Sequence, residues 1–180
     1  GVYINNMFQQ GFSHLESRNL SFEAWCYHPQ LPQLIQLAKK FPNTSIILNH
    51  FGGPLGVGSF TNKEDEIYDF WEKQILELSK CDNVIAKLGG IAMEINGFNW
   101  HNKPSPPTGD QLINRTKRYY DKTLELFGID RCMFESNFPV DKVSCSYVNL
   151  WNGFKTLTKN YSSSERAKLF HDNATKTYKL

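Results

Sequence analysis

Short apolar runs alternate along this chain with longer stretches of mixed polarity. The runs at 20–28, 45–50, 84–90 and 132–138 have the composition and length of buried β-strands. The stretches between and after them place apolar residues three and four positions apart, which is the spacing of a helix with one buried face. This repeated alternation predicts an α/β fold with a parallel sheet and helical crossovers.

The same spacings predict five helices. They are expected at about 31–40, 61–81, 108–127 and 147–157, with a shorter one opening at residue 162. Three of these starts have the capping-box pattern, in which a hydroxyl residue is followed three positions later by Glu or Gln. The three patterns begin at Thr61, Thr108 and Ser162, so they predict where those helices start.

Three of the four predicted strands end in side chains that carry protons or make hydrogen bonds. His28 closes the first run, His50 closes the second, and Glu135 and Asn137 lie at the end of the fourth. The carboxyl ends of parallel strands meet at one edge of a sheet, which is where α/β proteins bind ligands. We therefore expect these residues to form one site.

Composition narrows the class of partner. The 180 residues include 20 basic and 18 acidic ones, for a net charge of +2, and contain no block of Lys or Arg, so nucleic acid is not expected as a partner. No apolar run approaches the roughly 20 residues of a membrane helix, and the first residues lack the pattern of a secretion signal. We expect a single cytoplasmic domain, residues 1–180, that acts on a small molecule and not at a membrane.

Five motifs occur in an order that resembles one family of enzymes. They are Tyr-His-Pro at 27–29, Asn-His-Phe-Gly-Gly-Pro at 49–54, Lys-Leu-Gly-Gly at 87–90, Phe-Glu-Ser-Asn-Phe-Pro at 134–139 and Asn-Ala-x-x-x-Tyr-x-Leu at 173–180. The ordered set resembles the amidohydrolase-related (amidohydrolase 2) proteins, which include lactonases and decarboxylases. The resemblance implies parallel β/α units that form the C-terminal half of a TIM (β/α)8 barrel.

The resemblance also implies roles for individual residues. In the family, a His-x-His pair on the first strand, one His on the fifth, one on the sixth and an Asp on the eighth meet at the barrel mouth, often around a divalent metal. His28 and His50 match the fifth-strand and sixth-strand positions, so both are candidate catalytic residues and candidate ligands of zinc or manganese. A metal-independent mechanism stays open. Asn137 takes the position of the Asp.

Two departures from the family pattern change the expectation about assembly. No His-x-His occurs in the chain, and only four strands are predicted, whereas a complete barrel needs eight strands and about 250 residues. We therefore expect that the N-terminal strands are missing. Half a barrel leaves an apolar face and strand edges uncovered, so the expected partner is the missing N-terminal half or a second copy of the chain.

The amide at position 137 changes the expected chemistry, because an amide cannot act as a base. Glu135 lies on the same strand face, about 6.6 Å away, and either Glu135 or Asp141 could supply the missing negative group. Lys87 and Asp141 are candidate substrate-binding residues. Lys87 is expected to bind an anionic substrate or to lie solvated at the rim, and Glu135 is either a working carboxylate or the partner of Lys87.

Two classes of function follow from these residues. The first is hydrolysis of a small carboxylated lactone, or of a related C–O or C–N bond. In it His28 and His50 polarise the carbonyl or hold a metal, and a carboxylate near Asn137 activates water. A decarboxylase would use many of the same residues. The alternative is a catalytically silent half-barrel that serves as a binding or assembly module.

Overall fold

The computed structural model describes every residue from Gly1 to Leu180, and one parallel sheet lies at its centre. The four strands are β1 (Phe22–Ala24), β2 (Ile46–Leu48), β3 (Val84–Leu88) and β4 (Cys132–Phe134). They are hydrogen-bonded in that order, and all three neighbouring pairs are parallel. The predicted parallel α/β fold is confirmed, with each strand shorter than its apolar run.

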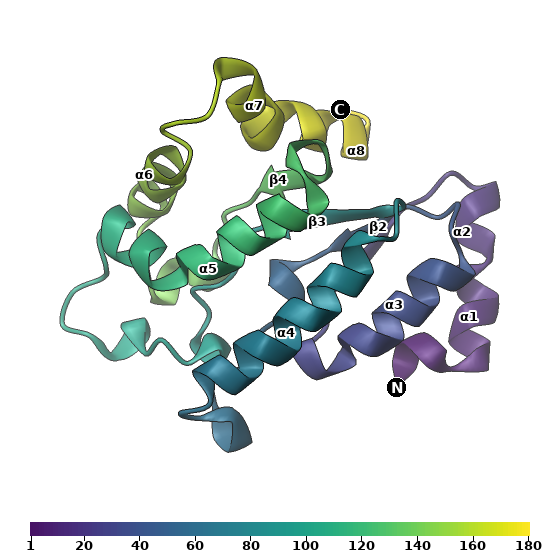
Figure 1. Cartoon of the computed structure of the whole chain (residues 1–180), viewed down its shortest axis with the longest axis horizontal. Coiled ribbons are helices and arrows are strands. Elements are labelled where there is room, and N and C mark those ends of the chain that lie inside the picture. Colours follow the sequence, from purple (N-terminus) through teal and green to yellow (C-terminus); the bar gives the residue numbers. More distant parts are fainter.

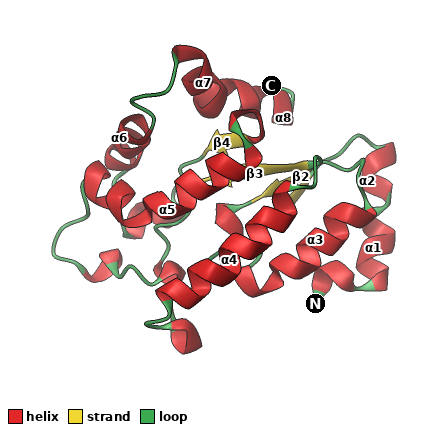
Figure 2. Ribbon diagram, viewed as in Figure 1, coloured by secondary structure: helices red, strands yellow, loops and turns green.

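Helices connect the successive strands and lie across one face of the sheet (Figure 1). α3 (Leu31–Lys40), α4 (Glu64–Ser79) and α5 (Gly109–Phe127) follow β1, β2 and β3. The elements outside these units are α1 (Asn6–Phe12) and α2 (His14–Ser17) before β1, and α6 (Tyr147–Leu157), α7 (Ser163–Ala167) and α8 (Asn173–Tyr178) after β4. Figure 2 shows the same alternation of strand and helix. No helix has both the length and the apolar character needed to cross a membrane.

Two of the three predicted helix starts are confirmed. At Thr108 and Ser162 the side chain accepts a hydrogen bond from the main-chain N–H three residues later, and the main-chain N–H of Thr108 or Ser162 donates to the side chain of Gln111 or Glu165. The prediction at Thr61 is wrong, because Thr61 is extended at the end of a 3-10 turn and α4 begins at Glu64. The first turn of α4 is acidic, and its carboxylates complement the positive end of the helix dipole without a side-chain cap.

The two faces of the sheet differ in what covers them. Ala24 and Cys26 belong to the core and are buried, whereas Glu23 and Trp25 alternate with them and are exposed. The Trp25 side chain keeps 41% of its surface accessible. We call the side of the sheet that carries Glu23, Trp25 and Lys87 the open face. The candidate site lies on this face, at the carboxyl ends of the strands.

Candidate active site

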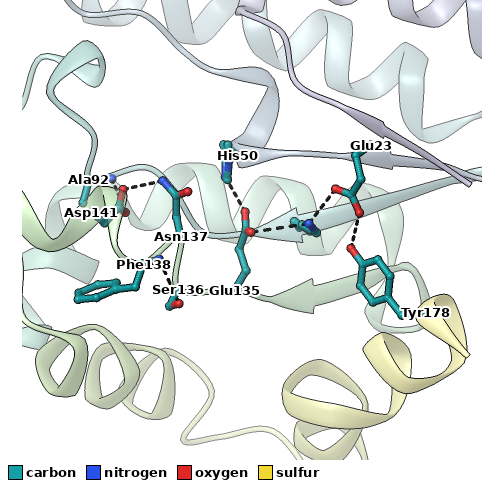
Figure 3. Close-up of polar contacts among 10 residues, drawn as sticks. Glu23, His50, Ala92, Glu135, Ser136, Asn137, Phe138, Asp141 and Tyr178 are labelled. Carbon is teal, nitrogen blue, oxygen red and sulfur yellow. Dashed lines mark hydrogen bonds and ion pairs between the residues drawn. The ribbon is translucent and has the colours of Figure 1, made fainter. Parts of the chain in front are cut away.

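The candidate site lies where β2, β3 and β4 end at the same edge of the sheet (Figure 3). His50 follows the end of β2 by two residues, the Gly89-Gly90 pair follows β3, and Glu135 directly follows β4. Because the strands are parallel, these three positions lie side by side. The sheet thus brings together residues that are far apart in the sequence.

His50 and Glu135 are in direct contact. His50 Nδ1 lies 2.6 Å from Glu135 Oε1, and the two side chains keep only 15% and 18% of their surface accessible. The two atoms are at ion-pair distance without the alignment of a hydrogen bond, and neither has another hydrogen-bond partner. The rings of Trp25 and His50 pack edge to face, with their centroids 4.8 Å apart. His50 and Glu135 therefore form a shielded carboxylate–imidazole pair.

The Gly89-Gly90 pair makes room for this contact. A Cβ atom at Gly90 would lie 2.2 Å from His50 Nδ1, and one at Gly89 would lie 2.2 Å from the carbonyl oxygen of Glu135. Gly90 also has a φ of +71°, a conformation that other residues rarely adopt. The Lys-Leu-Gly-Gly motif therefore serves the site by letting two side chains approach the end of β3.

Lys87 lies between two carboxylates on the open face. Its Nζ is 2.8 Å from Glu23 Oε2 and 3.9 Å from Glu135 Oε2. The Tyr178 hydroxyl donates to Glu23 Oε1 at 2.5 Å. Burial opposes the charge of Lys87, but the contacts with Glu23, Tyr178 and Glu135 outweigh it and raise its pKa.

This geometry bears on the two predictions made for Lys87. The ammonium group is neither solvated at the rim nor free for an anionic substrate, because two carboxylates already neutralise it. The alternative that Glu135 is its partner agrees with the contact at 3.9 Å, although Glu23 is nearer. An ion-pair role for Lys87 thus replaces the predicted substrate-binding role.

Asn137 and Asp141 form a second polar unit beside the first. Asn137 Nδ2 donates to Asp141 Oδ1 at 2.8 Å, and the main-chain N–H of Ala92 donates to Asp141 Oδ2 at 3.3 Å. Asp141 is fully buried, and burial raises its pKa to about 6 although the Asn137 amide favours the charged form. Both carboxylate oxygens of Asp141 accept a hydrogen bond, and the side chain is buried. Asp141 therefore orients Asn137, and it is not free to contact a substrate, which was its predicted role.

His28 lies apart from the other predicted site residues. Its Nδ1 accepts a hydrogen bond from the main-chain N–H of Leu55 at 3.1 Å, and its ring meets Phe60 and Phe70 edge to face. Only 3% of its surface is accessible, and burial lowers its pKa. His28 shares the buried side of its segment with Ala24 and Cys26, whereas Trp25, on the opposite side, reaches His50. The two imidazoles thus have different neighbours, and a site shared by His28 and His50 stays a prediction.

A family model described as amidohydrolase matches residues 5–180 of the chain. The chain belongs to the amidohydrolase family. Among curated proteins, an uncharacterised protein of Sinorhizobium fredii is 36% identical over 173 residues, which cover 96% of this chain and 52% of that protein. An L-fucono-1,5-lactonase of Burkholderia multivorans is 24% identical over 174 residues, which cover 96% of this chain and 56% of the lactonase.

A solved structure supports the same fold. An amidohydrolase from Burkholderia multivorans with bound zinc superposes on this chain with a TM-score of 0.84 at 21% identity, over 99% of this chain and 59% of that one. The four parallel β/α units therefore correspond to part of an amidohydrolase TIM barrel, as predicted. The chain spans about half the length of the curated relatives it matches.

A zinc or manganese centre requires several His, Cys, Asp or Glu side chains close together. His50 and Glu135 are adjacent and could each donate one atom. No group of three or more His, Cys, Asp or Glu residues in the chain could hold a metal ion, whereas zinc sites use at least three protein ligands. His28 and His50, the two predicted metal ligands, belong to no such group. The metal-ligating residues of this chain therefore do not fit a complete zinc or manganese centre.

Two residues of this part of the amidohydrolase fold were not predicted from the sequence as site residues. Glu23 binds Lys87, and Tyr178 binds Glu23 from the last helix. Glu23 carries only a weak local signal, because it is an exposed carboxylate in a short strand and such a residue can be solvated without a partner. Tyr178 carries no comparable signal, since its partner lies 155 positions away.

Proposed function

We propose that this chain belongs to a hydrolase that cleaves a small carboxylated lactone, or a related C–O or C–N bond. The observation that supports this proposal most is the contact between His50 and Glu135 at the carboxyl edge of the sheet. A carboxylate against one nitrogen of an imidazole orients the ring and stabilises the imidazolium that forms when the other nitrogen takes a proton. Family membership and the lactonase relative agree with hydrolysis.

The chemistry assigned to this pair is activation of water. His50 Nε2 takes a proton from water while the water oxygen bonds to the substrate carbonyl carbon, and Glu135 stabilises the resulting imidazolium. When the C–O bond of the lactone breaks, the same proton passes to the leaving oxygen and a hydroxy acid is released. The Asn137 amide has a second N–H, beyond the one bound to Asp141, that can donate to the carbonyl oxygen.

The test is a comparison of three variants on a panel of small lactones. Loss of a positioned acid–base group lowers kcat by about a hundredfold to ten-thousandfold, so His50→Gln and Glu135→Gln should both lose turnover to this extent. His28→Gln is the matched control and should keep kcat, because His28 contacts neither residue. Wild-type rates in Glu135→Gln would refute the proposal. Release of CO2 in place of a hydroxy acid would indicate the decarboxylase alternative.

A second candidate function is that of a silent binding or assembly module, and one observation favours it. Trp25 and Tyr27 keep 41% and 39% of their surface accessible on the open face, which is unusual for large aromatic side chains. In this alternative the chain binds the remaining strands of a barrel or a second copy of itself. A purified chain that hydrolyses nothing, alone or after addition of an N-terminal half from a relative, would support the module over the enzyme.

A further inference from the structure

Figure 3 shows a row of polar side chains across the open face, from His50 at the carboxyl edge to Tyr178 of α8. Each carboxylate in the row uses its two oxygens for two different partners. Glu135 places Oε1 against His50 and Oε2 toward Lys87, whereas Glu23 places Oε1 against Tyr178 and Oε2 against Lys87. The two carboxylates therefore compete for one ammonium group.

The distances show which carboxylate holds the ammonium more closely. Lys87 Nζ lies 2.8 Å from Glu23 and 3.9 Å from Glu135, so it makes a hydrogen bond only with Glu23. If the Lys87 ammonium moved into hydrogen-bond contact with Glu135, it would neutralise part of the negative charge with which Glu135 now faces His50. The position of Lys87 thus decides how much of the Glu135 charge is available to the imidazole.

We propose that Glu23 and Tyr178 are positioning residues, which hold Lys87 away from Glu135 so that the Glu135 carboxylate stays with His50. Tyr178 fixes the Glu23 carboxylate through its hydroxyl, and its ring lies 5.5 Å from the Lys87 ammonium. The last helix of the chain thereby controls the carboxylate–imidazole pair through two intermediate side chains. This inference rests on the proposed function for its catalytic consequence but not for its structural one.

The discriminating experiment is a rescue by a second substitution. Glu23→Gln should free Lys87 to bind Glu135 and lower kcat by about tenfold, the value of one charged hydrogen bond, with KM changed less than about twofold. Glu23→Gln combined with Lys87→Met should recover kcat to within about threefold of wild type, because no ammonium is left to sequester Glu135. A merely structural role for Glu23 predicts the opposite order, with the double variant worse than the single.

Two controls and an independent readout complete the test. Tyr178→Phe should act in the same direction as Glu23→Gln, whereas Tyr161→Phe, which removes a hydroxyl without a hydrogen bond, should not. The ring 15N signals of His50, measured by NMR, should shift in Glu23→Gln and return in the double variant. The NMR measurement tests the positioning role of Glu23 and Tyr178 even if the chain hydrolyses no substrate. Absence of hydrolysis would refute only the proposed function. Unchanged His50 signals in both Glu23→Gln and Tyr178→Phe, or a double variant worse than the single, would overturn the inference.

Discussion

Asn137→Asp is the substitution that most directly tests the charge arrangement at the end of β4. Asn137 Nδ2 donates to Asp141 Oδ1 at 2.8 Å, and Asp141 is fully buried. An aspartate at position 137 would place a second carboxylate at this distance and remove the donor. Asp tolerates the left-handed conformation of this residue, whose φ is +53°, so the backbone itself should not oppose the change.

The cost can be worked out from the pKa of Asp141. Two carboxylates this close do not both stay charged, and the less costly outcome is that one takes a proton. Because the pKa of Asp141 is about 6, protonation at pH 7 costs about 1.4 kcal/mol for that one pH unit. Loss of the amide-to-carboxylate hydrogen bond adds about 1.5 kcal/mol. The free energy of unfolding should fall by about 3 kcal/mol at pH 7 and by less at pH 5, where the proton is already bound.

Urea denaturation at the two pH values measures this effect. With a slope of about 2 kcal/mol per molar urea, the midpoint should fall by about 1.5 M at pH 7. Asn62→Asp is the matched control, since Asn62 is exposed and also has a positive φ of 61°. Combining Asn137→Asp with Asp141→Asn restores one amide and one carboxylate and should recover most of the loss. A single variant as stable as the control, or a double variant no better than the single, would refute the reasoning.

Three further predictions concern pH, the site and the C-terminal motif. Asp141→Asn removes a group whose folded pKa is about 6, above its value in the unfolded chain. Between pH 4 and 6 the folded wild type keeps a proton that the unfolded chain releases, so the free energy of unfolding of the wild type minus that of the variant should fall by up to about 3 kcal/mol as the pH rises. A difference between the two proteins that does not change with pH in urea titrations would contradict this. Gly90→Ala should lower kcat by about a hundredfold by displacing His50, whereas Gly58→Ala, also at positive φ but with nothing within 4 Å, should not. Asn173→Ala should cost about 2 kcal/mol in urea unfolding, because two main-chain carbonyls lose donors at 2.7 Å.

Much of the fold could be predicted because its signals are local. The alternation of apolar runs with helical spacings is enough for a parallel sheet, since each crossover needs a helix and returns the chain in the same direction. The capping boxes at Thr108 and Ser162 formed because both partners lie within one helical turn. Thr61 has the same pattern, but a preceding 3-10 turn holds it extended, and a spacing rule cannot detect that competition.

The candidate site was only partly predictable, for two different reasons. His28 matches a family motif position, but the motif does not encode its surroundings: His28 opens a 3-10 turn beyond β1 and is buried against Phe60 and Phe70. The contact between Tyr178 and Glu23 has no local signal at all, because only the folded sheet brings α8 to β1. Long-range pairs of this kind require the structure.

The two unusual residues at the end of β4 explain each other. Lys87 is the one lysine in contact with Glu135, and Glu23 already holds it. An aspartate at position 137 would add a further negative charge beside the buried Asp141. Asn137 avoids that repulsion and donates to Asp141, which leaves Glu135 as the carboxylate that meets His50. The backbone separates these two roles: β4 ends at Phe134 and Asn137 has a φ of +53°, so Glu135 and Asn137 do not continue the strand alternation and reach different partners.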